Sequence, residues 1–231
     1  MRNKNSRTRI FITIMLVFLT AGSLTATSFH LGGGYSYTMF DNAFDSPLDS
    51  ERIMGKGIEH EATVNTAAYL GKSNSFGLGL DLNFRMPMRN SWEGYDDTEL
   101  LPFGIGTNLT LISRIPFTKS NTFGMHTKLG AGMTYRNSDA NAYPEIHQGA
   151  TKIQDLDAKL LTGIGFYADI AKRVSISAGI DFNVSLARFY KASGSKENEV
   201  FKTPNWIALK DVVGHETRGY ITVSYIFTDR D

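Results

Sequence analysis

The sequence of 231 residues contains no cysteine, so disulfide bonds cannot hold its fold together. It also lacks a bias toward one charge, because 24 lysines and arginines stand against 23 aspartates and glutamates. This balance gives no reason to expect a nucleic-acid partner. Beyond Leu24 no apolar run is long enough to cross a membrane as a helix. If the rest of the chain lies in a membrane, it must cross it as β-strands.

The single long apolar run lies near the N-terminus, from Ile10 to Leu24. Four basic residues precede it: Arg2, Lys4, Arg7 and Arg9. Small residues follow it and allow cleavage after Ala26 or after Ser28. This layout is typical of a secretory signal peptide, and the run is short for a membrane anchor of about 20 residues. We expect a signal peptide at residues 1–26, with cleavage as late as residue 28, and one mature domain at residues 27–231.

Apolar and polar residues alternate over most of the mature chain. Between Phe76 and Met88 every second residue is apolar, and the residues between them are mostly Gly, Asp, Asn and Arg. A period of two indicates a strand with one apolar and one polar face. The run is longer than the usual soluble strand of about 5–6 residues. The same pattern, weaker in the first, second and last cases, predicts strands at residues 30–40, 58–70, 76–88, 101–117, 123–136, 156–170, 174–188 and 215–227.

The connections between these strands are alternately long and short. The short ones are residues 71–75, 118–122 and 171–173, and the long ones are 41–57, 89–100, 137–155 and 191–214. Two short connections share a motif, KSNSFG at residues 72–77 and KSNTFG at residues 119–124, in which small polar residues favour a hairpin turn. The strands echo each other as well, as GLDLNF at 79–84 and GIDFNV at 179–184 show. We therefore predict an all-β fold, an eight-stranded antiparallel up-and-down barrel.

The polar face of the predicted strands is rich in glycine. Its glycines are Gly77, Gly79, Gly104, Gly106, Gly124, Gly130, Gly132, Gly163, Gly165 and Gly179. Glycine weakens a water-facing strand without benefit, whereas a narrow eight-stranded lumen has room only for small side chains. We expect the polar face to line the lumen and the apolar face to contact lipid. A soluble barrel with an apolar interior remains the alternative.

Aromatic residues mark both ends of the predicted strands. Phe76, Phe117, Phe123 and Phe227 lie beside the short turns, and Tyr37, Phe103, Tyr135 and Tyr190 lie near the long loops. Two such belts are typical of the aromatic girdles of a membrane barrel.

The last strand, RGYITVSYIF at residues 218–227, places Gly219, Ile221, Val223, Tyr225 and Phe227 on one face. It resembles the C-terminal strand of bacterial outer-membrane barrels, and the mature chain resembles the small barrels of the OmpA-transmembrane, OmpX and OmpW type. The resemblance implies insertion by the barrel-assembly machinery through this strand. It also implies a location in the cell outer membrane, with lipid around the wall, short periplasmic turns and long extracellular loops. One departure is that residues 228–231 follow Phe227, whereas the aromatic residue usually ends the chain.

Several charged residues fall on the predicted inner face. Near mid-height we expect Glu61, Asp81 and Asp181 to meet Arg85, Lys128 and Arg218, and lower down Arg114 to meet Asp169. Unpaired charges in a lumen filled by side chains are costly, so these groups should pair. The pattern predicts an ionic plug, with a charge-selective constriction as the alternative.

The sequence offers little for catalysis or metal binding. It has no HExxH motif, and His126 is followed by Thr127 and Lys128 rather than by the His-x-Ser pattern of lipid A deacylases. Asp96–Asp97 resembles the aspartates of barrel proteases, but no matching Asp–His pair accompanies it. We therefore expect no enzyme, no cofactor and no metal. His60–Glu61 and His215–Glu216 allow a rim metal site as an alternative to ordinary rim polarity.

The long loops are where a surface ligand would bind, because loops on a rigid scaffold commonly carry function. Trp92, Tyr95, Tyr143 and Trp206 are candidates for such contacts, or else members of the upper girdle. Our hypothesis is a non-enzymatic outer-membrane protein with four surface loops that serves envelope structure or adhesion. The alternative is a narrow, OmpW-like channel for small polar or hydrophobic solutes.

Overall fold

The computed structural model describes residues 26–45, 52–71, 74–92, 103–139, 150–194, 206–208 and 212–228. The strands within these ranges are β1 (Ala26–Asp45), β2 (Arg52–Leu70), β3 (Phe76–Trp92), β4 (Phe103–Pro116), β5 (Phe123–Asp139), β6 (Ala150–Ile170), β7 (Val174–Gly194), β8 (Ile207–Ala208) and β9 (Val213–Thr228). The predicted signal peptide lies outside the described residues up to the start of β1. Of the described residues, none belongs to a helix long and apolar enough to cross a membrane.

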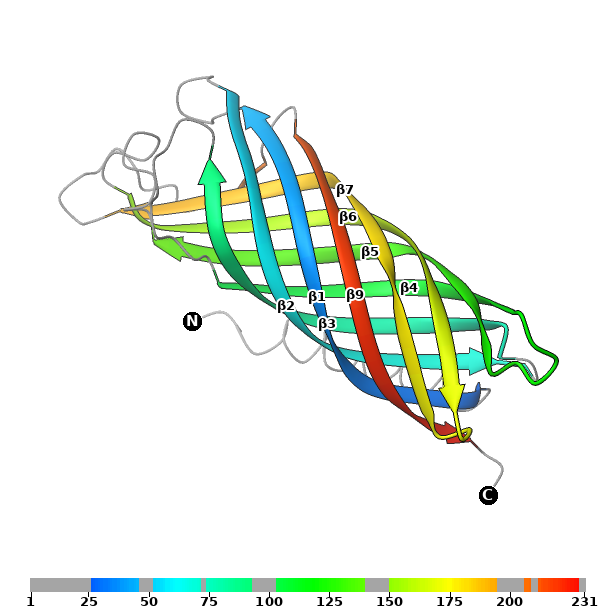
Figure 1. The fold of residues 1–231 in the computed structure, drawn as a ribbon. Helices are drawn as coiled ribbons and strands as arrows, with labels where there is room; N and C mark the ends of the chain where they lie inside the picture. Colours follow the sequence, from blue (N-terminus) through cyan, green and yellow to red (C-terminus); the bar gives the residue numbers. More distant parts are fainter. Residues whose placement is uncertain are drawn as a thin grey trace, which may run out of the picture.

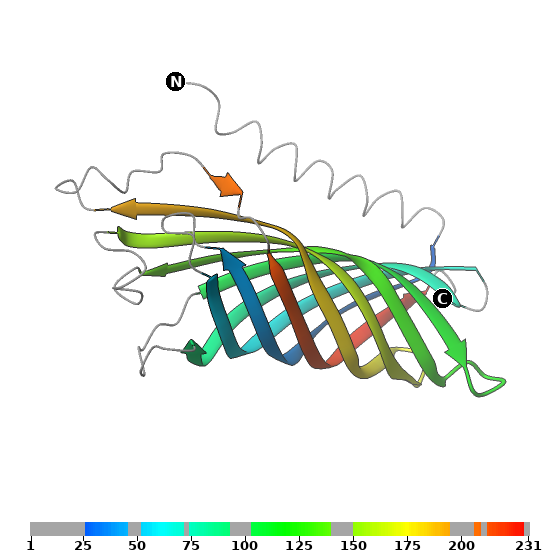
Figure 2. The ribbon, with the colours of Figure 1, turned by 90° about the horizontal axis from the view of Figure 1, so that it is seen from above.

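The long strands close into a barrel (Figure 1). Strands β1 to β7 pair in sequence order, each antiparallel to the next, and β9 pairs with both β1 and β7. Figure 2 shows the same closed wall after a quarter turn, with its strands tilted along it. The eight-stranded antiparallel up-and-down barrel is therefore confirmed. The two-residue strand β8, which pairs with Phe189 and Tyr190 of β7, has no counterpart in the predicted pattern.

The short turns explain the repeated KSN motif. The asparagine of each copy has a left-handed backbone, with φ of 50° at Asn74 and 57° at Asn121. Asparagine tolerates this conformation better than most residues that carry a β-carbon. In the third short turn, residues 171–173, Ala171 and Lys172 also have a left-handed backbone, with φ of 51° and 62°. Alanine and lysine tolerate this conformation less well than asparagine.

At the short-turn rim most strands end within one residue of the predicted boundary, except β1, which begins at Ala26 rather than at residue 30. At the other rim most strands continue further than predicted, except β4, which begins at Phe103 rather than at residue 101. Strand β2 begins at Arg52 rather than at residue 58, β6 begins at Ala150 rather than at 156, and β7 ends at Gly194 rather than at 188. Near this rim the sequence no longer alternates between apolar and polar residues. The backbone hydrogen-bond ladder continues without alternation, because it does not depend on the side chains.

We call the rim with the short turns the lower rim and the opposite rim the upper rim. A β-bulge changes the inward–outward order in the upper part of β7. Ala158 stands opposite Ala187, whereas the next residue of β6, Lys159, stands opposite Ser185. The extra residue in β7 reverses the alternation beyond it, as bulges do. Strict alternation from Val174 would turn Arg188 outward, but its side chain is buried in the lumen.

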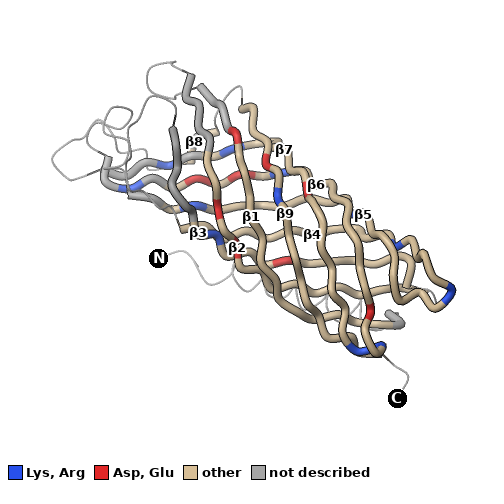
Figure 3. The backbone as a smooth tube through the Cα atoms, viewed as in Figure 1, with Lys and Arg blue, Asp and Glu red and all other residues tan. Residues whose placement is uncertain are grey.

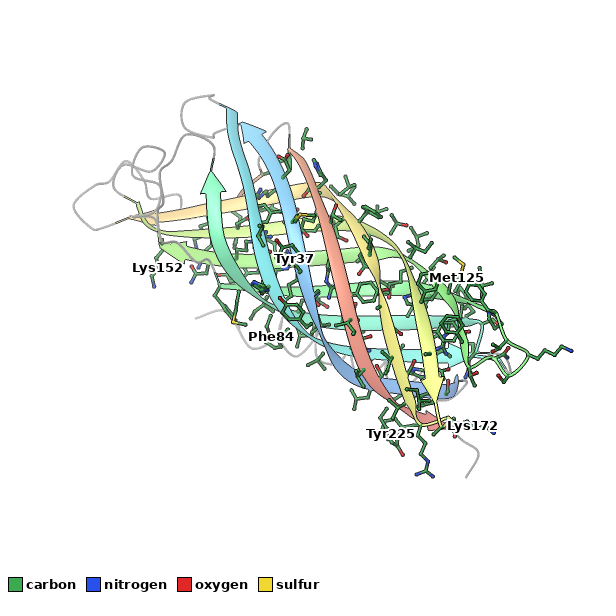
Figure 4. All side chains as sticks on the ribbon, in the orientation of Figure 1. Tyr37, Phe84, Met125, Lys152, Lys172 and Tyr225 are labelled. Carbon is green, nitrogen blue, oxygen red and sulfur yellow. The ribbon has the colours of Figure 1, made fainter. Side chains whose placement is uncertain are left out.

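Burial in this barrel is inverted relative to a soluble domain. Ile105 and Ile180 lie on the outer wall, 40% and 45% exposed, while Asp181 is fully buried in the lumen. Figure 4 shows side chains projecting from the outer wall along its whole length, Tyr225 and Met125 among them. The apolar face is therefore outside and the polar face inside.

Glycines make room for the side chains that fill the lumen. A β-carbon at Gly163 would collide with the carboxylate of Asp181, and one at Gly132 would collide with the amide of Asn108. These positions therefore need glycine because polar groups cross in front of them.

The predicted girdle residues lie mostly exposed on the outer wall. At the lower rim the ring of Phe117 meets that of Phe123 edge-on at a centroid distance of 5.6 Å, and Phe76 and Phe227 are exposed there as well. At the upper rim Tyr37 and Phe103 are exposed, and Tyr135 is partly covered. The side chain of Tyr190 lies outside the described set.

Candidate functional site in the barrel lumen

Every second residue of a strand faces the lumen. Among the described side chains, inward-facing charged residues come from seven of the eight long strands. Among the described side chains the acids are Glu59, Glu61, Asp81, Asp155, Asp157, Asp169, Asp181 and Glu216, and the bases are Arg85, Arg114, Lys128, Arg136, Lys159, Arg188 and Arg218. Figure 3 shows most of the charged positions in the half of the barrel that leads to the long connections. They form an upper, a middle and a lower layer.

Glu216 of β9 lies at the centre of the upper layer. Arg85 of β3 donates to both of its carboxylate oxygens, at 3.1 and 3.3 Å, and Arg136 of β5 donates at 3.2 Å. Lys159 of β6 and the amide of Asn183 also donate to it. Three cations from three different strands thus converge on one carboxylate.

Other acids complete the upper layer. Glu59 accepts from Arg85 and from Arg136, in each case at 3.0 Å. Asp155 accepts two hydrogen bonds from Arg188, at 2.8 and 2.5 Å. Because each cation here has two carboxylates or a bidentate partner, the layer forms a connected network.

The middle layer is organised by Arg218 of β9. Its guanidinium pairs with Glu61 and with Asp181, both at 3.2 Å, and also donates to Ser36, Thr63 and Asn83. Arg85 reaches Glu61 from above at 3.2 Å, which joins this layer to the upper one.

Lys128 of β5 completes the middle layer. Its ammonium group lies 3.4 Å from Asp181 and 3.6 Å from the centre of the Tyr220 ring. This cation is therefore held by an ion pair and by a cation–π contact together.

In the lower layer an ion pair between Arg114 and Asp169 lies close to the short turns. Arg114 of β4 donates to Asp169 of β6 at 2.7 Å, and Ser175 donates to the same carboxylate at 2.7 Å. The guanidinium carbon lies 3.5 Å from the Tyr167 ring centre and 4.9 Å from that of Tyr69. Arg114 thus fills the lumen by stacking as well as by charge.

A cavity of about 50 Å³ lies between the middle and lower layers. Its lining includes Asn65, Asp81, His126, Lys128 and Arg218. The sequence predicts eight charged residues in the lumen. Of these, Asp81 lines the cavity and forms no ion pair with any described side chain. The other seven take part in the pairs given above: Glu61, Arg85, Arg114, Lys128, Asp169, Asp181 and Arg218.

Sequence reasoning did not assign seven charged residues of the lumen to the network: Glu59, Arg136, Asp155, Asp157, Lys159, Arg188 and Glu216. Asp157 and Lys159 were already on the polar face of a predicted strand, so that pattern could have identified them. Asp155 fell in a predicted loop, because the strand extends beyond its alternating part. Strict alternation assigns Arg188 to the outer face, because it does not include the β-bulge that turns this residue inward.

The two His-Glu pairs do not form joint sites. His60 faces outward and hydrogen-bonds to Tyr35, while Glu61 faces inward. His215 and Glu216 are likewise on opposite sides of the wall. Because neighbouring strand residues point to opposite faces, neither pair offers both of its side chains to one metal ion. Among the described residues no group of three or more His, Cys, Asp or Glu side chains could hold a metal.

One of the four loop aromatics can be placed with its side chain. Trp206, 41% exposed, lies with its ring 6.5 Å from that of Tyr135, at the upper girdle. Trp92 ends β3, but its side chain lies outside the described set, as do Tyr95 and Tyr143 entirely.

Known structures resemble this barrel. The outer membrane protein OprG from Pseudomonas aeruginosa matches with a TM-score of 0.58 at 14% identity, over 88% of this chain and 97% of that one. This chain has the fold of a small outer-membrane barrel. Neisserial surface protein A matches with a TM-score of 0.53 at 10% identity, over 85% of this chain and 96% of that one. No protein-family model matches the sequence, and no curated protein is significantly similar to it.

Proposed function

We propose that the chain is a non-enzymatic integral protein of the outer membrane, a barrel closed by salt bridges that presents four surface loops for envelope structure or adhesion. The observation that carries this proposal is the inverted wall, apolar outside and ionic inside. Such a wall is stable only when lipid covers its exterior, because a large exposed apolar surface in water would drive aggregation.

The ionic layers support a closed lumen. Arg85 connects β3 to Glu216 on β9, and Arg136 connects β5 to Glu59 on β2. Buried ion pairs that lose one partner leave an uncompensated charge, at a cost of about 3–5 kcal/mol. A solute passing through the lumen would have to part several of these pairs at once.

The arrangement of the connections supports a scaffold for loops. The three short turns lie at one rim, and the segments between residues 45 and 52, 92 and 103, 139 and 150, and 194 and 213 join strands at the other. We propose that the short turns are periplasmic and that the long segments face the outside. A rigid barrel that holds four neighbouring loops suits a binding surface.

Gel migration and protease protection test the membrane barrel itself. Detergent-extracted protein should migrate faster unheated than boiled, and surface protease on whole cells should cut the long loops while leaving the barrel intact. Unchanged migration together with complete digestion would refute an outer-membrane barrel.

Planar lipid bilayers test the closed lumen. We expect no stable unitary currents from the purified protein, because the ionic layers block the axis. The second candidate function, a narrow channel for small solutes, is favoured by the polar cavity beneath the middle layer. It would gain support from stable currents that disappear in Lys128→Met or Asp81→Asn, since both side chains line that cavity.

We further propose that the barrel-assembly machinery recognises β9 and that the first 26 residues are removed on export. Ile221, Val223, Tyr225 and Phe227 form an exposed apolar row on β9. Replacing Phe227 with Ser should lower the amount of folded barrel in cells, whereas Thr228→Ser should not. The mass of the mature protein gives the cleavage point directly.

A further inference from the structure

Two similar strand segments each place an aspartate in the lumen, but the two carboxylates differ in their partners. GLDLNF in β3 and GIDFNV in β7 place Asp81 and Asp181 at the same position of the motif. Asp181 is fully buried and pairs with Arg218 and Lys128. Asp81 receives no ion pair or hydrogen bond from any side chain in the described part of the barrel, although it lines the cavity beneath these groups.

The charge count of the layers leaves this carboxylate uncompensated. In the upper layer four acids meet four bases, and in the lower layer Asp169 meets Arg114. In the middle layer the described bases are Lys128 and Arg218, against the three acids Glu61, Asp81 and Asp181. Arg85 also pairs with Glu61, but it is already counted in the upper layer, so the described side chains of the lumen include eight acids and seven bases. Moving Lys128 from Asp181 to Asp81 would only transfer the deficit from one acid to the other.

The neighbour of Asp81 is also a hydrogen-bond acceptor without a donor. Asn65 stands directly opposite Asp81 across β2 and β3, which places their β-carbons about 4.5–5.5 Å apart. The amide nitrogen of Asn65 donates to Ser224, so its oxygen faces away from that bond, buried and without a partner. An anion and an amide oxygen cannot satisfy each other, and a donor or a cation is needed between them.

The buried side chain of His30 is a second observation that indicates an occupant in the cavity. Its side chain is only 4% exposed, lines the same cavity, and has a ring nitrogen, Nε2, without any partner. The cavity of about 50 Å³ has room for roughly three or four water-sized groups. Its polar lining therefore favours a hydrated occupant over an empty space.

We infer that this cavity binds one monovalent cation of the sodium or potassium class, held by the Asp81 carboxylate, by the Asn65 oxygen and by cavity water. A divalent metal would need more carboxylate or imidazole ligands than converge here. The ion balances the charge of the middle layer in a closed barrel and in a conducting one alike, so the inference does not depend on the proposed role.

Thermal unfolding of the full barrel in detergent tests the inference. Its midpoint, followed by gel migration, is measured in potassium chloride and in N-methyl-D-glucamine chloride, whose cation is too large for the cavity. At ten times the dissociation constant the midpoint should rise by about 3 to 6 °C. Asp81→Asn should remove this difference, because its amide can donate to the Asn65 oxygen. Asp169→Asn, in the lower layer, should lower the midpoint in both salts but keep the difference.

Thallium(I), a potassium substitute with a strong anomalous signal, locates the ion in crystals. An anomalous peak in contact with Asp81 and Asn65, absent in Asp81→Asn, supports the site. Equal midpoints in the two salts, a salt difference that survives in Asp81→Asn, or a cavity that holds only water would each overturn it.

Discussion

Removing the charge of Glu216 should destabilise the barrel more than most single substitutions. In Glu216→Gln the side chain keeps its size, but Arg85, Arg136 and Lys159 lose the carboxylate that they share. The side chains of these three cations are at most 8% exposed, so water cannot replace the lost partner. Loss of one partner from a buried ion pair costs about 3–5 kcal/mol.

The remaining acids place the effect at the lower end of that range. Arg85 and Arg136 both retain Glu59, and Lys159 retains Asp157 at 3.5 Å. We therefore expect Glu216→Gln to lower the free energy of unfolding by about 3 kcal/mol. For a chain of this size that corresponds to a fall of about 6–12 °C in the unfolding midpoint.

Urea titration in lipid vesicles, followed by gel migration, measures this loss. Lys119→Gln, which removes a charge from an exposed turn, should change stability by less than about 0.5 kcal/mol. Adding Lys159→Met to Glu216→Gln restores the charge balance, so the pair should recover about 1 kcal/mol or more relative to additivity. If Glu216→Gln lowers the free energy of unfolding by less than about 0.5 kcal/mol, the reasoning is refuted. Such a small loss is typical of ion pairs on an exposed surface and would mean that water screens the ion pairs in the lumen to the same extent.

Three further substitutions test the lumen, the turns and the outer wall by the same titration. Gly163→Ala should destabilise the barrel by about 1–3 kcal/mol, because its methyl group collides with Asp181, whereas Gly219→Ala, with open space around it, should be nearly neutral. Lys172→Gly should stabilise by about 1 kcal/mol, because it relieves a left-handed backbone, and an unchanged value would contradict that account. Ile180→Arg should cost about 2–4 kcal/mol in a bilayer, and a neutral result would mean that this face does not contact hydrocarbon.

Local pattern was sufficient for the architecture. The period of two, repeated in eight segments with alternately long and short connections, predicts an up-and-down barrel, and the structure confirms this architecture. The glycine-rich polar face predicts which side is inside, because only a narrow lumen favours residues as small as Gly163 and Gly132. The upper ends of the strands could not be predicted, since the hydrogen-bond ladder there continues without an apolar face.

The strands, their order and the identity of the apolar face of each follow from residues that are close along the chain, so the pattern of the sequence predicts them. The pairing of the charges inside the lumen depends on the closed barrel. Strand stagger and the bulge before Arg188 set the height and facing of each side chain, and neither leaves a mark in the alternation. Glu216 meets Arg85 from 131 residues away. Partners at such separations are selected by closure of the barrel, which no local pattern encodes.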